Sequence, residues 1–178
     1  MCVCVCGRST ADATRAGATR QCARIVGSLV GHSDRVSGVA FVTDPMCKQL
    51  AHLLVSVGND GAVRLWDARP DVMLGLGKLG SHDQAATAVA CSPCAGASDV
   101  VLSAGRDGTL RVWSIKGKAM RSCWRPLTAT GGPVWPCAVA LSPASASAAA
   151  VGYQSGAVLL VDIDASTVTQ KLAGHEEQ

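Results

Sequence analysis

Short apolar runs of about four to eight residues, broken by Gly, Pro, Asp and Ser, follow one another through most of this chain. Runs of this length between turn residues predict β-strands, and no segment has the length and period of a helix. We therefore predict an all-β protein with four strands in each of three successive units. The predicted strands are 35–42, 53–57, 62–67 and 73–79 in unit one, 87–91, 100–104, 109–115 and 119–124 in unit two, and 137–141, 148–152, 157–162 and 167–172 in unit three.

The units also repeat a common sequence. Residues 55–67 read VSVGNDGAVRLWD, and residues 102–114, which lie 47 positions further on, read LSAGRDGTLRVWS. Residues 151–162, VGYQSGAVLLVD, are a weaker third copy. A period of this length indicates structural units that stack on their neighbours. Asp-Gly between the second and third strands favours a type I′ hairpin, in which both central residues have positive φ.

These residues resemble WD40 repeats, which carry Gly-His near the start, Ser in the second strand, Asp-Gly in the turn and Trp-Asp after it. Unit one has Gly31-His32, Ser56, Asp60-Gly61 and Trp66-Asp67, and unit two has Ser81-His82, Ser103, Asp107-Gly108 and Trp113-Ser114. Unit three departs from the pattern, with Gly131-Gly132, Val151, Ser155 and Val161 at these places. The resemblance implies a partial β-propeller of about three four-stranded antiparallel blades that do not close into a ring.

The expected organisation is a leader followed by repeats. Residues 1–23 show no apolar periodicity and are expected to be disordered, while WD40 repeats fill residues 24–178. Their boundaries are 31–80, 81–130 and 131–173, with the start of a fourth unit at 174–178. Propellers close with roughly four to eight blades, so we expect this chain to be a fragment of a larger protein. Residues 25–30 then belong to a blade before unit one.

The resemblance implies that each of the first two units holds a side-chain hydrogen-bond network. The two sets are His32, Ser56, Asp60 and Trp66, and His82, Ser103, Asp107 and Trp113. An alternative is a hydrolytic triad formed by Ser56, His32 and Asp60. We favour the structural role because the same set recurs in both units. We therefore expect no enzyme activity, catalytic residue, cofactor or metal.

Partner contacts are implied at the start of each first strand and just before each turn Asp. The residues at these positions are Arg35, Ser37, Asn59, Thr87, Arg106, Trp135 and Gln154. Two arginines beside a Trp suit an acidic or phosphorylated peptide, because Arg pairs with carboxylate and phosphate through two hydrogen bonds. Trp135 alternatively covers the rim of unit three. The chain is thus expected to act as a protein-interaction scaffold, without a membrane or a small-molecule substrate as its partner.

The basic residues of unit two leave a second function, RNA binding, open. Six cations lie among residues 106–125: Arg106, Arg111, Lys116, Lys118, Arg121 and Arg125. These charges either protect an outer edge strand from pairing or bind RNA phosphates, and we favour edge protection. Residues 57–66 also look like the WD repeats of telomerase- and vault-associated proteins. This likeness suggests a WD-repeat arm of a large NTPase or ribonucleoprotein-associated protein.

Composition further narrows the class of protein and its expected location. The chain has 178 residues, of which 48% are hydrophobic and 16% charged, with a net charge of +3. Its nine cysteines are scattered and follow no secretory signal, so we expect reduced thiols and a cytoplasmic or nuclear location. The alternating cysteines of residues 2–6 could hold a soft metal, and Cys91 and Cys94 have redox spacing, but we favour structural roles for both groups.

Overall fold

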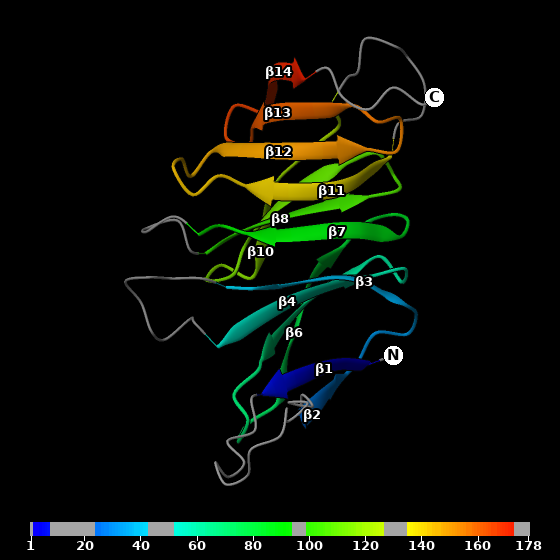
Figure 1. The fold of residues 1–178 in the computed structure, drawn as a ribbon, viewed down its shortest axis with the longest axis vertical. Helices are drawn as coiled ribbons and strands as arrows, with labels where there is room; N and C mark the ends of the chain where they lie inside the picture. Colours follow the sequence, from blue (N-terminus) through cyan, green and yellow to red (C-terminus); the bar gives the residue numbers. More distant parts are fainter. Residues whose placement is uncertain (1, 8–23, 43–51, 94–98, 127–134, 173–178) are drawn as a thin grey trace, which may run out of the picture.

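The computed structural model describes residues 2–7, 24–42, 52–93, 99–126 and 135–172. These residues form β-strands and no helix, which confirms the predicted all-β class. Twelve of the described strands make three four-stranded antiparallel sheets, and the strand order in each sheet follows the chain. The sheets stack along the long axis of the molecule (Figure 1) and do not close into a ring. Since the described segments contain no helix, none of them contains a helix that could span a membrane.

The strand boundaries agree with the predicted ones to within two residues. Sheet 1 consists of β3 (Val36–Phe41), β4 (Leu53–Gly58), β5 (Ala62–Asp67) and β6 (Leu74–Ser81). Sheet 2 consists of β7 (Ala86–Cys91), β8 (Val100–Gly105), β9 (Leu110–Ser114) and β10 (Ala119–Trp124). Sheet 3 consists of β11 (Pro136–Leu141), β12 (Ala148–Tyr153), β13 (Val158–Asp162) and β14 (Thr167–Leu172).

Burial follows the composition of the strands. The second strands β4 and β8 are apolar except for Ser56 and Ser103, and every residue in them is buried. Such runs suit a strand that is covered on both faces. The outermost strand β14 has the mixed sequence TVTQKL, and every residue in it is exposed. The apolar core therefore lies near the first three strands of each sheet.

The sheets pack face to face. We call the face that points to the next sheet in the chain the front face, and the opposite one the back face. The front face of sheet 1 and the back face of sheet 2 share one apolar core, and sheets 2 and 3 share another. The first strands β3, β7 and β11 are neighbours, whereas the outer strands have few contacts with one another. The stack is therefore a fan of sheets, as expected for blades of a propeller.

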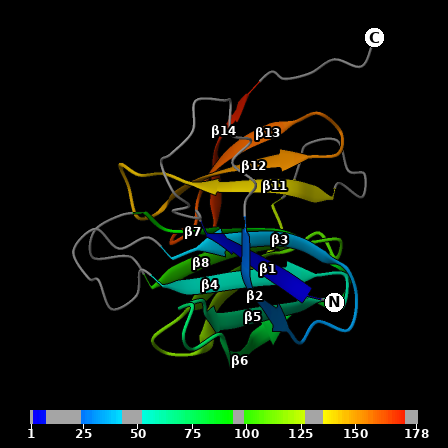
Figure 2. The ribbon, with the colours of Figure 1, turned by 60° about the horizontal axis from the view of Figure 1, so that its bottom comes forward.

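A two-stranded sheet precedes sheet 1. β2 (Arg24–Val30) pairs with β1 (Cys2–Gly7). Both strands lie on the back-face side of sheet 1 and are nearest the viewer in Figure 2. Leu29 packs on Trp66, and a Cβ added to Gly31 would lie 2.8 Å from the Trp66 ring. In the same way, a Cβ added to Gly80 at the end of β6 would clash with the Trp113 ring. β2 therefore has the place of an outer strand from a preceding unit.

The structure differs from the expected disordered leader at Cys2–Gly7, which form β1. Valine and cysteine alternate there, and a period of two suits a strand that finds a partner. The partner is β2, with Cys2 opposite Val30 and Gly7 opposite Arg24. Residues 8–23 and 174–178 lie outside the described residues, as does most of the linker between units two and three.

The predicted type I′ turns are wrong. Gly61, Gly108 and Gly156 have φ of 73°, 76° and 80°, but the residues before them do not have positive φ. The amide of Gly61 donates to the Gly58 carbonyl at 3.0 Å, so the loop is a tight turn followed by a left-handed glycine. The backbone of Asp60 stays in an ordinary conformation, and its carboxylate remains available to neighbouring donors.

Candidate functional site

A buried chain of hydrogen bonds crosses sheet 1. The indole Nε1 of Trp66 lies 2.7 Å from Ser56 Oγ, and Ser56 Oγ lies 2.7 Å from His32 Nε2. His32 Nδ1 lies 2.9 Å and 3.0 Å from the two carboxylate oxygens of Asp60. The indole can only donate and an ionised carboxylate can only accept. Protons therefore point in one direction, from Trp66 through Ser56 and His32 to Asp60, and every polar group is satisfied.

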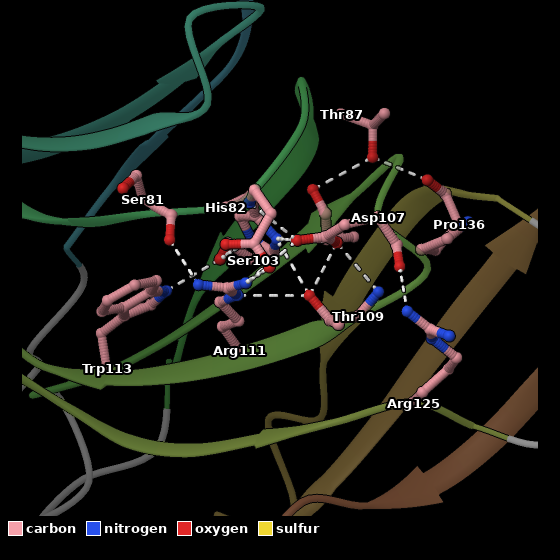
Figure 3. A network of polar contacts seen from close by, with 12 residues as sticks. Ser81, His82, Thr87, Ser103, Asp107, Thr109, Arg111, Trp113, Arg125 and Pro136 are labelled. Carbon is pink, nitrogen blue, oxygen red and sulfur yellow. Dashed lines mark hydrogen bonds and ion pairs between the residues drawn. The ribbon is translucent and has the colours of Figure 1, made fainter.

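Sheet 2 repeats this network and enlarges it (Figure 3). Trp113 Nε1 lies 2.8 Å from Ser103 Oγ, which lies 2.7 Å from His82 Nε2, and His82 Nδ1 lies 3.2 Å from the Asp107 carboxylate. Thr109 Oγ1 donates to Asp107 at 2.7 Å, and Arg111 forms a 3.1 Å ion pair with Asp107. The second network is therefore held by more donors than the first.

These contacts shift the ionisation of the second network. Burial alone would raise the pKa of Asp107, but hydrogen bonds from the Thr109 side chain and amide and from the Asp83 amide outweigh burial and lower the pKa to about 2. Burial lowers the pKa of His82, although Asp107 opposes that shift. The network therefore combines a neutral imidazole with an ionised carboxylate, in agreement with the proton direction derived above.

The hydrolytic triad considered for Ser56, His32 and Asp60 does not fit this geometry. Ser56 is 0% exposed and His32 is 3% exposed. The Ser56 oxygen accepts from Trp66 and donates to His32, so no side of it faces solvent or a bound substrate. A nucleophile must reach the substrate carbonyl, and this hydroxyl lies inside the sheet.

Sheet 3 fills the same space in another way. Tyr153 stands at the position of Gly58 and Gly105, where an added Cβ would come within about 3 Å of a histidine ring. The side chain of Tyr153 is 5% exposed and belongs to the core between sheets 2 and 3. In the sequence of unit three, Gly132 replaces the histidine. A large ring thus compensates for the lost imidazole, a change that sequence comparison with the WD40 pattern missed.

Two of the residues predicted to bind a partner also connect the sheets. Thr87 Oγ1 lies 2.6 Å from the Pro136 carbonyl of sheet 3 and 3.1 Å from the Ala104 carbonyl of its own sheet. Ser37 Oγ approaches the Ala86 carbonyl of sheet 2 in the same manner. These contacts place the starts of β3, β7 and β11 side by side.

The other predicted partner residues form exposed pairs at that edge of the stack. The Asn59 amide donates to the Arg35 carbonyl at 2.8 Å, and the Gln154 amide donates to the Trp135 carbonyl at 3.1 Å. The Arg106 amide donates at 2.8 Å to Ala85 at the equivalent position. The side chains of Arg35 and Arg106 are exposed, and none of the ion pairs among the described residues includes them. Trp135 is 41% exposed.

The basic segment of unit two divides into two groups. Arg111 pairs with Asp83 and Asp107, and Arg125 donates to the Asp107 carbonyl at 2.8 Å, so both support the network. Lys116, Lys118 and Arg121 are exposed at the outer edge, and no ion pair of the described segments includes them. Besides Arg106, this second group remains available to a partner.

A further repeated pair, which the sequence analysis missed, lies at the opposite ends of the strands. Asp67 forms a 2.6 Å ion pair with Arg69 and lies 3.6 Å from His52. The equivalent positions hold Ser114 with Asp99, at 3.0 Å, and Asp162 with Ser147, at 3.3 Å. The acid ends the third strand in units one and three, as Asp67 and Asp162, but precedes the second strand in unit two, as Asp99. A search for Trp-Asp therefore does not find the pair in every unit. A hydrogen bond from Arg69 is the main cause that lowers the pKa of Asp67.

The cysteine alternatives gain no support from the described residues. These residues hold no group of three or more His, Cys, Asp or Glu side chains that could bind a metal. Burial raises the pKa of the Cys91 thiol to about 12, which keeps it protonated and a poor nucleophile. Cys94 lies outside the described residues, as do the side chains of β1.

Radially stacked four-stranded sheets with a buried Trp–Ser–His–Asp chain define a repeat protein of the β-propeller type. The WD40 family (WD domain, G-beta repeat) matches residues 23–67 and 76–114. The chain therefore contains WD40 repeats at these two positions. Gem-associated protein 5 from Mus musculus is 27% identical over 157 residues, or 87% of this chain. The chain spans about 10% of the length of that relative.

Proposed function

We propose that this chain is a non-catalytic protein-interaction scaffold and that its partner binds where β3, β7 and β11 begin. The observation that carries this proposal is the recurring exposed pair at that edge. Backbone hydrogen bonds hold the two members of each pair at the same place in every sheet. Rigid strands below them restrict their motion, so little entropy is lost when a partner binds.

The side chains at this edge favour an acidic partner. Arg35 and Arg106 are exposed at the edges of sheets 1 and 2, and Trp135 is partly exposed at the same edge of sheet 3. Arginine and tryptophan are the residue types that most often dominate binding energy at interfaces. Guanidinium groups bind carboxylate or phosphate through paired hydrogen bonds. A peptide with acidic or phosphorylated residues fits this combination.

Charge reversal tests the proposed site. Wild-type protein and the double variant Arg35→Glu/Arg106→Glu are used to capture proteins from a nuclease-treated cell extract. The matched control is Lys118→Glu/Arg121→Glu, which reverses the same number of charges on the outer strand. We expect the partners of the wild type to be lost from the first variant and kept by the second. Unchanged partners in the first variant would contradict the assignment.

RNA binding at the outer edge is the second candidate. It is favoured by Lys116, Lys118 and Arg121, whose exposed cations could follow a phosphate backbone. This function would suit a WD-repeat arm of a large NTPase or ribonucleoprotein-associated protein of the telomerase or vault type. A single-stranded RNA filter-binding assay with the Lys118→Glu/Arg121→Glu variant tests it, and retention of RNA by that variant would contradict it.

We also propose that the chain is part of a longer protein and that this protein is cytoplasmic or nuclear. The length of the mouse relative supports a chain that is one part of a longer protein. A cytoplasmic or nuclear location suits both candidate functions. Imaging of the tagged full-length protein tests the location, and a secreted protein would contradict it.

A further inference from the structure

Arg111, in the third strand of sheet 2, has an acceptor for each of its side-chain nitrogens (Figure 3). Its Nη2 forms 3.1 Å ion pairs with Asp83 and with Asp107. Its Nε lies 3.2 Å from Thr109 Oγ1, and its Nη1 donates to the Ser81 carbonyl. The guanidinium of unit two is therefore fully used by its own unit.

Arg64 has the equivalent position in sheet 1 but not the equivalent partners. A Cβ added to Gly31, the counterpart of Ser81, would lie 3.3 Å from Arg64 Nη1, so this guanidinium has a similar place in its unit. The Nε atom of Arg64 is buried and has no hydrogen-bond partner among the described residues. None of the ion pairs within the described segments includes Arg64.

Two differences in sequence explain why Arg64 lacks these partners. Ala62 stands at the position of Thr109 and has no hydroxyl. Ser33 stands at the position of Asp83 and has no charge. All partners of the arginine in sheet 2 come from its own unit, and the structure describes each of the equivalent residues in unit one. The difference therefore lies within unit one and does not depend on a sheet that precedes it.

The backbone of Ser33 is held in the same way as that of Asp83. The Ser33 amide donates to Asp60 Oδ2 at 3.0 Å. The Asp83 amide donates to Asp107 Oδ2, also at 3.0 Å. Ser33 is exposed, and its Oγ lies 3.5 Å from Asp60 Oδ2, at the limit of a hydrogen bond. An accessible and weakly held hydroxyl thus stands where unit two has a carboxylate.

We propose that Ser33 is a phosphorylation site and that its phosphate binds the guanidinium of Arg64. A protein kinase supplies the phosphoryl group from a nucleoside triphosphate. The bond from Ser33 Oγ to the γ-phosphorus forms, the bond from that phosphorus to the β-phosphate oxygen breaks, and the hydroxyl proton passes to a base of the kinase. A nucleoside diphosphate leaves. The modified side chain carries a charge of about −1.5 to −2 and three strong acceptor oxygens.

The phosphate supplies both of the missing acceptors. Guanidinium groups bind phosphate through paired hydrogen bonds, and the Nε atom of Arg64 is one donor without a partner. The nearby carboxylate of Asp60 does not prevent this. In unit two, one guanidinium lies 3.1 Å from both Asp83 and Asp107, so it holds two acidic groups together. Phosphorylation gives unit one the ion pair that unit two has permanently, and this role is independent of the proposed partner site.

Mass spectrometry of the tagged full-length protein, isolated from its own cells with phosphatase inhibitors, tests the modification. We expect a phosphopeptide whose fragment ions place the phosphate on Ser33 rather than on Ser28. The Ser33→Ala protein should lack this phosphopeptide. Absence of phosphate from Ser33 in growing, mitotically arrested and stressed cells would overturn the proposal.

Phosphorus NMR of the chain with phosphoserine incorporated at position 33 tests the pairing. The pKa of the phosphate should be lower in the folded protein than in urea, because a nearby cation favours the doubly charged form. Arg64→Gln should remove this difference, and Arg64→Lys should keep part of it. Arg35→Gln is the matched control, since Arg35 is exposed and lies two residues from Ser33, and it should retain the difference. The same pKa in folded and unfolded protein, or a difference lost in Arg35→Gln but kept in Arg64→Gln, would contradict the assignment.

Discussion

The hydroxyl of Thr87 lies 2.6 Å from the carbonyl oxygen of Pro136, so a side chain of sheet 2 reaches the backbone of sheet 3. Ser37 makes the same kind of contact from sheet 1 to Ala86 of sheet 2. Apolar faces can slide over one another, whereas a hydrogen bond to one carbonyl fixes their relative position. These two hydroxyls therefore align the exposed pairs that we propose as the partner site.

Thr87→Val keeps the shape of the side chain and removes this hydrogen bond. We expect a loss of about 0.5–1.5 kcal/mol in the free energy of unfolding, measured by urea titration. Thr169→Val is the control, because the Thr169 hydroxyl donates to Leu160 at 3.0 Å within its own sheet and at an exposed site. An equal loss in both variants would show that the contact between sheets has no special role.

Ser103→Ala should destabilise the protein more strongly. The change leaves the Trp113 indole N–H and His82 Nε2 buried without their common partner. An unsatisfied buried polar group costs about 1–3 kcal/mol, and urea titration would measure the loss. Ser122→Ala on β10 is the control and should change the unfolding free energy by less than about 0.5 kcal/mol. A Ser103→Ala protein as stable as this control would mean that the hydrogen-bond chain does not hold the sheet.

Tyr153→Phe should behave in the opposite way. The Tyr153 hydroxyl is buried and has no hydrogen-bond partner among the described residues, and burial raises its pKa to about 12. Removing an unpaired buried hydroxyl while keeping the ring should leave the melting temperature equal or higher. Differential scanning calorimetry measures this. A clearly lower melting temperature would show that the hydroxyl has a partner that stabilises the fold.

Stability should fall as the pH decreases from about 7 to about 5, because the folded pKa of His82 is lowered from 6.5. Below that ordinary value His82 of the unfolded chain binds a proton that folded His82 does not bind, so protonation favours the unfolded state. A further loss is expected below pH 3.8, because folded Asp107 keeps its charge down to about 2. Melting temperatures measured across this range for the wild type and His82→Gln test the assignment. Equal slopes between pH 7 and 5 would contradict it.

The strands and the two hydrogen-bond networks could be predicted because their signals are local in sequence. Strand 62–67, for example, is set by its apolar run and its turn glycine. The roles of Ser37 and Thr87 could not be predicted, since both depend on a carbonyl that belongs to the following sheet. Tyr153 was missed for a related reason: its ring fills a space that only the packed sheets define.

The proposed scaffold function depends most directly on an acidic-peptide site at Arg35 and Arg106. An array of acidic, phosphorylated, neutral and basic peptides, probed with purified protein, measures this preference. We predict that the wild type retains the acidic or phosphorylated peptides and that Arg35→Glu/Arg106→Glu binds them at least about tenfold more weakly, which corresponds to about 1.4 kcal/mol. Lys118→Glu/Arg121→Glu should bind like the wild type. A wild type without preference for acidic peptides, or equal binding by the Arg35→Glu/Arg106→Glu variant, would contradict the account.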